Sequence, residues 1–459
     1  MQNKKIWKIN KLYNCILLLF ILANFTHNTA LSSQYDQTNK IQFCPALDLL
    51  VPSRFDIIAK YIYAKHNDMS INSTWATDLY YAHLRVWNNF YEAYPLKTSS
   101  NDYVTAFNSI LKTCKKEGFV FPAIEVDPKK VPLDGSHRIA ASLLYHHDVP
   151  YSYRPNPSTI CASASFFKQA YFGTLEEKYL DAMALEYVAL KKNTYVALIF
   201  PVAQEKEAEI KTIMGKYAQI VYDKTVVLHS NGPLNLIKHI YKGEAWLGSH
   251  NNNFAGVQFA AHERFPLGNG TVRVYLLESD SFENIKACKE EIRALFGLSN
   301  KAIHTTDTHE QTLLLAQTVF NKNSLSFFNN RNTKSYEHFE KFFSTYKQWL
   351  EKHAINPETV CIDSSAVLAA YGLRDCNDLD FIAHRFNATI PLAPNIDNHS
   401  VHAHYYDLPL DEIIFNPTYH FYWEGLKFTS LDIVKQMKEK RAEGKDIHDI
   451  QLINQLQGQ

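Results

Sequence analysis

The sequence predicts a mixed α/β protein with two or three domains. Segments rich in β-branched and aromatic residues alternate with segments whose apolar residues recur at helical spacing, a pattern that favours sheets covered by helices. The 459 residues are 46% hydrophobic and 13% aromatic, which suffices for packed cores. Because 47 basic residues balance 47 acidic ones, the chain lacks the basic excess of a nucleic-acid-binding protein, and no nucleic-acid partner is expected.

Residues 1–32 have the composition of a secretory signal peptide. Four lysines precede an apolar stretch from Tyr13 to Phe25, and the small residues of Ala30-Leu-Ser32 follow it. The stretch is shorter than the roughly 20 residues that a membrane-spanning helix needs. We therefore expect export to a periplasmic, extracellular or lumenal compartment. The leader is either cleaved or kept as an N-terminal anchor, which would then be the chain's attachment to the membrane.

A first domain is expected over residues 43–158. Apolar residues at helical spacing predict helices at 54–63, 74–94 and 102–116. Gly118 then ends the helical pattern, and residues 121–126 have the composition of a strand. A polar turn with glycine, a short helix that starts at His137, and a second strand that begins with Val149-Pro-Tyr151 complete the domain.

The turn Gly135-Ser136-His137-Arg138 is a candidate phosphate site, because it presents free amides and positive character at a helix start. The unit over about residues 118–155 resembles the ParB/sulfiredoxin fold, whose members carry Gly-x-x-Arg or Gly-Cys-His-Arg at this turn and hold nucleotide phosphates there. This resemblance implies a nucleotide at Gly135, Ser136, His137 and Arg138. Ser136 stands where sulfiredoxin has cysteine, so reduction chemistry is not expected. The alternative is a structural turn in which Arg138 pairs with Asp134 or Asp127.

A middle α/β region is expected over residues 177–328. Buried strands are predicted at 195–201, 218–221 and 272–277, and helices at 205–216, 282–295 and 311–320. The sequence leaves open whether this region is a separate domain or part of the C-terminal one. The polar residues 329–334 separate it from an aromatic-rich helix at 336–350.

The C-terminal domain, expected over residues 335–455, carries the clearest chemical pattern. Asp378 and Asp380 stand two apart between apolar residues, so in a strand they point to the same face. Two carboxylates so placed are what a magnesium ion bridging substrate phosphates needs. Upstream, Ser364 and Ser365 precede a short helical run, at 366–371, whose first amides could receive a phosphate.

This region resembles the nucleotidyltransferase superfamily, whose signature is Gly-Ser opening a helix, about a dozen spacer residues, and Asp-x-Asp on a strand. Twelve residues separate Ser365 from Asp378, while Ser364 replaces the family's glycine. A basic helix followed by Lys445-Asp-Ile-His-Asp449 resembles the tail of toxin-type and sugar-modifying members. The resemblance implies that Asp378 and Asp380 hold magnesium as catalytic carboxylates. It further implies that phosphate is contacted by four residues: Ser364, Ser365, Lys438 and Arg441.

The third catalytic carboxylate is less evident from the sequence. Asp411 is the candidate for third ligand or base, with Glu412 and Asp407 as rivals. The expected function is transfer of a nucleotidyl or phosphoryl-sugar group from a nucleotide or nucleotide-sugar to a glycan or small-molecule acceptor. The alternative is a non-catalytic protein that binds nucleotide or phosphate and has lost turnover, as Ser364 in place of glycine would suggest.

Overall fold

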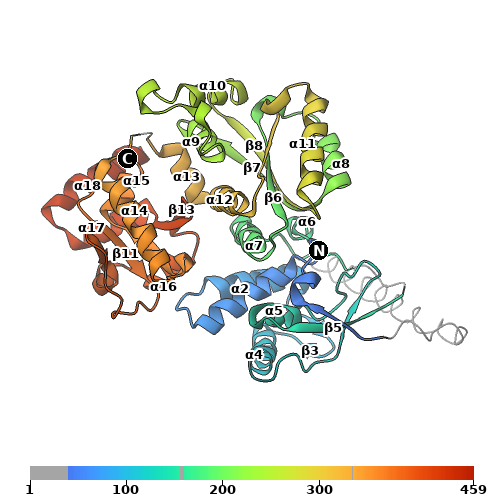
Figure 1. The fold of residues 1–459 in the computed structure, drawn as a ribbon. Helices are drawn as coiled ribbons and strands as arrows, with labels where there is room; N and C mark the ends of the chain where they lie inside the picture. Colours follow the sequence, from blue (N-terminus) through green and yellow to red (C-terminus); the bar gives the residue numbers. More distant parts are fainter. Residues whose placement is uncertain (1–39, 156–159, 333, 459) are drawn as a thin grey trace, which may run out of the picture.

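The computed structural model describes residues 40–155, 160–332 and 334–458, and it confirms the mixed α/β fold class. Figure 1 shows three groups of elements, coloured blue to teal, green to yellow and orange to red along the chain. The predicted leader, residues 1–32, lies outside the described residues. Within the part that is described, no helix has the length and apolar character that crossing a membrane requires.

The first unit is a small sheet flanked by helices. The sheet has the order β1-β5-β4, in which β4 and β5 are parallel and joined by helix α5, and β1 pairs antiparallel with β5. A two-stranded ribbon, β2 with β3, lies between two of the helices in sequence. In chain order the elements are β1 (Gln42–Pro45), α2 (Asp56–Met69), α3 (Trp75–Asn88), β2 (Glu92–Ala93), β3 (Leu96–Lys97), α4 (Ser100–Glu117), β4 (Ile124–Val126), α5 (Ser136–Tyr145) and β5 (Asp148–Tyr153).

The three helices expected between residues 54 and 116 are all present, but α3 is shorter than predicted. It ends at Asn88 because Asn89 and Phe90 take φ values of +50° and +60°, which cannot continue a right-handed helix. Helix α4 follows the β2–β3 ribbon and starts with a capping box, in which Ser99 and Asp102 satisfy each other's backbone amides.

The middle unit is a four-stranded antiparallel sheet with the order β7-β8-β6-β9. Its strands and covering helices follow the order β6-α8-β7-β8-α11-β9, the split βαβ arrangement, with α9 and α10 inserted between β7 and β8. Helices α8 and α11 cover one face, and α7 and α12 belong to the core of the other. The elements are α6 (Ala164–Lys168), α7 (Glu177–Leu190), β6 (Thr194–Ile199), α8 (Glu207–Tyr217), β7 (Gln219–Leu228), α9 (Gly232–Ile240), α10 (Ala255–Arg264), β8 (Gly270–Glu278), α11 (Phe282–Phe296), β9 (Ile303–Thr305), α12 (His309–Val319) and α13 (Lys322–Asn330).

The C-terminal unit has its own five-stranded mixed sheet, with the order β12-β11-β10-β14-β13. Strand β10 is antiparallel to β11 and parallel to β14, and β12 is parallel to β11. The elements are α14 (Glu337–Lys352), β10 (Val360–Asp363), α15 (Ser365–Ala370), β11 (Leu379–Ala383), β12 (Ile396–Asn398), α16 (Leu410–Phe415), β13 (His420–Trp423), β14 (Leu426–Thr429), α17 (Leu431–Arg441) and α18 (Gly444–Gln457).

Helix α14 covers one face of the C-terminal sheet through its aromatic side chains. Tyr346 and Trp349 both pack on Phe381 of β11, with ring centroids 5.4 Å apart in each pair. Phe343 packs on Phe428 of β14. Because side chains alternate along a strand, the neighbours of Phe381, including Asp380, point to the opposite face.

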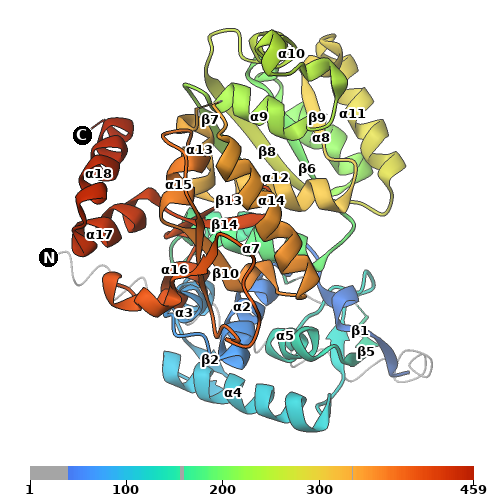
Figure 2. The ribbon, with the colours of Figure 1, turned by 60° about the vertical axis from the view of Figure 1, so that its left-hand side comes forward.

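The three units share one hydrophobic core, which includes buried residues from each of them. The first and last units also meet directly, where helix α16 approaches the loop between α2 and α3 (Figure 2). There the backbone amide of Asn72 donates to the carboxylate of Asp411 over 2.7 Å. The six cysteines of the described residues are all free thiols.

Candidate functional site

A row of aspartates crosses the C-terminal sheet. In the strand register, Asp380 of β11 is paired with Asp363 of β10 on one side and with Asp397 of β12 on the other. Residues paired across neighbouring strands point to the same face. Asp378, two residues before Asp380, joins them on that face. The sheet therefore gathers four carboxylates on the side opposite α14.

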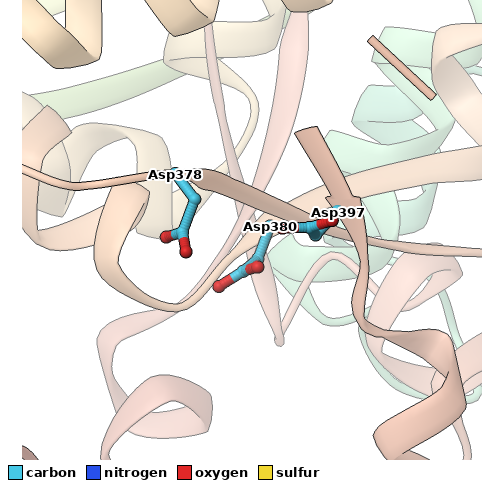
Figure 3. A group of neighbouring side chains, drawn as sticks. All are labelled: Asp378, Asp380 and Asp397. Carbon is cyan, nitrogen blue, oxygen red and sulfur yellow. The ribbon is translucent and has the colours of Figure 1, made fainter. Parts of the chain in front are cut away.

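Three of these carboxylates are placed as ligands for one cation. Asp378, Asp380 and Asp397 each offer an oxygen, and these oxygens lie within 4.8 Å of one another. Figure 3 shows the three side chains, of which Asp378 directly precedes β11, Asp380 lies in β11 and Asp397 lies in β12. The sequence prediction named Asp378 and Asp380 but missed Asp397. The short segment Ile396-Asp397-Asn398 carries a weak strand signal, and it is the sheet register that brings Asp397 beside Asp380.

The structure does not bring Asp411 into this group. Its carboxylate accepts from the backbone amide of Asn72, and it lies 2.8 Å from Nδ1 of His384, four residues beyond Asp380. The rivals also have other partners. Glu412 accepts from the amide of Thr74, and Asp407 forms an ion pair with Lys440. Asp397 therefore replaces Asp411 as the candidate third carboxylate.

Asp363 is fully buried and holds His399 in place. It accepts hydrogen bonds from the hydroxyls of Thr429 (2.8 Å) and Tyr406, and Nδ1 of His399 lies 3.4 Å from its second oxygen. Burial alone would raise the pKa of Asp363, but these donors hold it below its ordinary value. The other ring nitrogen of His399 lies 4.0 Å from Asp380.

Two of the titratable groups here have raised pKa values. Burial raises the pKa of Asp380 to about 6; the charges of Asp378 and Asp363 add to this rise, whereas the His399 imidazole opposes it. Burial would lower the pKa of His399, but its hydrogen bond to Asp363 and the charge of Asp380 outweigh that, so its pKa is raised. A bound cation would offset both the burial of the ionised Asp380 and the charges of its neighbouring carboxylates.

Ser364 and Ser365 connect β10 to α15 beside the aspartates. Ser364 has φ +60° and ψ −131°, a conformation that glycine adopts at little cost and other residues adopt with strain. The serine thus keeps the backbone geometry that the glycine of the nucleotidyltransferase signature would favour. The hydroxyl of Ser365 donates to Asp378 over 3.4 Å.

Lys438 and Arg441, predicted to contact phosphate, are held by the acidic residues of the C-terminal motif. Lys438 is 1% exposed and forms ion pairs with Asp449 (2.7 Å) and Asp446 (3.2 Å). Two nitrogens of Arg441 donate to Asp446, and two of Arg374 donate to Asp449. The role of Lys-Asp-x-x-Asp is therefore structural in part, since its two carboxylates fix three cations at the edge of the site.

These groups line a single cavity of about 530 Å³. The three clustered aspartates and both serines contribute to its wall, as do Arg374, Lys438 and Arg441. A volume of this size accommodates a small ligand. A lining that combines clustered carboxylates with cations is suited to a metal-bound phosphate, because a metal would contact the acids and the phosphate oxygens would contact the cations.

The second predicted site, the turn Gly135–Arg138, borders a cavity of about 580 Å³ in the first unit. Here the side chains have partners within the protein. Arg138 donates to Asp134 (2.8 Å) and to the carbonyl of Pro122 (2.7 Å), and Nε2 of His137 lies 2.8 Å from the Tyr80 hydroxyl. Burial holds the pKa of His137 well below its ordinary value, so it adds no charge at neutral pH. The pairing of Arg138 with Asp134 is the one expected of a structural turn.

Comparison of the chain with protein-family models, curated proteins and solved structures found no match.

Proposed function

We propose that the protein is a metal-dependent transferase of the nucleotidyltransferase type. Its reaction would move a nucleotidyl or phosphoryl-sugar group from a nucleotide or nucleotide-sugar to a glycan or small-molecule acceptor. The observation that carries this proposal is the convergence of Asp378, Asp380 and Asp397 at a cavity that cationic side chains also line.

The donor set fits magnesium, which takes hard oxygen ligands and usually binds through a few carboxylates plus substrate phosphates. Asp378, Asp380 and Asp397 would hold it. When bound, magnesium offsets charge on the phosphates and polarises the bond to the leaving group. The raised pKa of Asp380 supports this assignment. Burial is its main cause, with the charges of Asp378 and Asp363 adding to it, and a bound cation would offset both effects.

The surrounding residues would bind the donor's phosphates and accept the proton of the acceptor. The cations Arg374, Lys438, Arg441 and Lys445 carry four positive charges against the three of Asp446, Asp449 and Glu443, so their excess charge favours the donor's phosphates. Asp397 is exposed, whereas Asp380 is buried. It is thus the carboxylate that an acceptor hydroxyl reaches first. In the transfer the acceptor oxygen bonds to phosphorus, the bond to the leaving phosphate breaks, and Asp397 takes the hydroxyl proton.

The export that the leader predicts affects which donor substrate would be available to the protein. Free nucleoside triphosphates are scarce outside the cytoplasm, so a nucleotide-sugar in a secretory lumen, or delivery of the protein into a host cell, would fit export. ATP and UDP-glucose are therefore both useful probes.

The test is magnesium-dependent nucleotide binding by the Asp378→Asn/Asp380→Asn double variant. We expect ATP or UDP-glucose with magnesium to raise the melting temperature of the wild type and to leave that of the double variant unchanged. Asp407→Asn is the matched control, because Asp407 is exposed and outside the cavity. Equal magnesium-dependent stabilisation of wild type and double variant would refute the metal site.

The alternative, a binding protein without turnover, is favoured by Ser364, whose side chain stands where the signature has glycine. Both proposals expect nucleotide binding that depends on the aspartates. They differ in release of the leaving group, which an enzyme produces during transfer or slow hydrolysis. This product is pyrophosphate from ATP, and from UDP-glucose it is glucose 1-phosphate after nucleotidyl transfer or UMP after phosphoryl-sugar transfer. Absence of this product from a protein that binds the nucleotide, with Ser364→Gly tested in parallel, would select the alternative.

A further inference from the structure

A second cavity, of about 370 Å³, lies where the middle and C-terminal units meet. Its walls come from α9, α13, α14 and the turn between β13 and β14, together with Arg331 just after α13. Strand β13 is at the opposite edge of the C-terminal sheet from β12, which carries Asp397. This cavity is therefore distinct from the one at the aspartates.

Cations outnumber anions in this cavity. The described residues of its lining include two carboxylates, Glu340 and Glu424, and four cationic side chains, which are Lys238, Lys242, Arg331 and Lys347. Glu424 alone serves two of the lysines, since it pairs with Lys242 and lies 3.8 Å from Lys347. The lining therefore has an excess of two positive charges. Arg331 and Lys238 form no ion pair with the described residues, although the charges of Glu340 and Glu424 act on both.

Arg331 and Lys238 are the cations with free binding capacity. Nε of Arg331 donates to the carbonyl of Ala370 over 3.0 Å, and the guanidinium lies 4.3 Å from the ring centroid of Trp423. These contacts fix the side chain, while its two Nη groups donate to no described residue. Lys238 lies over the Phe254 ring at 4.1 Å and forms no ion pair with a described residue.

The same cations are held at an electrostatic cost. Burial lowers the pKa of Arg331 to about 10, and burial together with the charge of Arg331 lowers the pKa of Lys238. The pKa of Lys347 is lowered by burial and by Lys242, although Glu424 opposes this. His239 is neutral at pH 7, because burial lowers its pKa to about 4. An anion bound in the cavity would reduce the electrostatic cost of holding these cations there.

We propose that this cavity binds a small phosphate-bearing anion, with Arg331 and Lys238 as its principal ligands. An arginine whose two Nη groups are free presents a fork that matches two oxygens of one phosphate. Lys238 from α9 and Lys347 from α14 flank that fork on two further elements, which suits a tetrahedral group with three free oxygens better than a planar carboxylate. The excess of two positive charges matches a doubly charged phosphate.

The test is calorimetric titration of the whole chain with inorganic pyrophosphate in EDTA, so that no metal is available to the aspartates. We expect saturable binding that weakens at least tenfold in Arg331→Gln and in Lys238→Gln. Lys341→Gln is the matched control on α14, because Lys341 is exposed and outside the cavity. Asp378→Asn is the control for the other site. Both controls should bind pyrophosphate within twofold of the wild type.

Lys238→Gln keeps the test decisive if Arg331→Gln fails to fold, because the Lys238 side chain forms no hydrogen bond or ion pair with the described residues that folding would lose. Wild-type binding in a folded Lys238→Gln variant would overturn the proposal, as would the absence of saturable binding to the wild type. Succinate is the comparison ligand. Binding of succinate as tight as that of pyrophosphate would overturn the assignment to phosphate.

Discussion

Replacing Asp380 with Asn should stabilise the metal-free protein at neutral pH. Asp380 is 8% exposed, and its pKa is raised to about 6 by burial and by the neighbouring carboxylates. An unfolded chain ionises its aspartates near pH 3.9. Folding therefore carries a cost for the ionised Asp380 that is absent at low pH, grows as the pH rises from about 4 to 6, and is complete above pH 6.

The magnitude follows from the two pKa values. Their separation of about 2 units corresponds to about 3 kcal/mol at pH 7.5, and about 1 kcal/mol of this remains at pH 4.5. Asn has nearly the shape of Asp and no charge, so Asp380→Asn should recover most of that free energy. For a chain of 459 residues, the recovered 3 kcal/mol corresponds to a rise in melting temperature of about 3 °C.

The assay is urea or thermal unfolding of wild type and variant in EDTA at pH 4.5 and 7.5. Asp363→Asn is a control from the same row with the opposite sign, because Asp363 accepts three hydrogen bonds and has a lowered pKa, so its loss should destabilise the protein at pH 7.5. An increase in the free energy of unfolding by Asp380→Asn that is equal at the two pH values, or no increase at pH 7.5, would refute the reasoning.

Three further predictions concern single side chains. Ser364→Gly should raise the free energy of unfolding by about 1 kcal/mol, since φ is +60° there, and a loss in urea unfolding would contradict this. Asp449→Asn should lower that free energy by about 3 kcal/mol, because it removes a partner of the buried Lys438, and equal urea midpoints would argue against the buried pair. His420 is 2% exposed, and burial lowers its pKa to about 3. Its contribution to the free energy of unfolding is therefore complete above pH 6.5 and falls by about 2 kcal/mol between pH 7 and 5, because the unfolded chain binds the proton there and the folded chain does not. A pH dependence unchanged in His420→Gln would show that other groups cause it.

The sequence predicted the parts of the site that depend on local pattern. Asp378 and Asp380 could be placed on one face because strand side chains alternate, and the helix after Ser365 followed from its apolar run. Asp397 could not be found this way, because its position beside Asp380 is set by the pairing of β11 with β12. Asp411 looked equally suitable in sequence, and only the fold shows its contact with Asn72.

The charged residues show the same limit of local reasoning. In the sequence, Lys438 and Arg441 have the charge expected of phosphate ligands, but α18 brings Asp449 and Asp446 into ion pairs with them. Whether a cation is free depends on what packs beside it, and here the next helix in the chain supplies the partners. The excess of cations around Arg331 could not be predicted from the sequence, because the residues that line this cavity come from four separated segments.

The core shared by all three units makes excision of the C-terminal unit unfavourable. The lining of the aspartate cavity comes entirely from that unit, so a shorter fragment would retain every candidate ligand. Cutting the chain before α14 would nevertheless expose apolar surface now covered by the other units and would deprive Asp411 of its amide donor, Asn72. We expect limited proteolysis to yield no stable C-terminal fragment and calorimetry to show one cooperative transition.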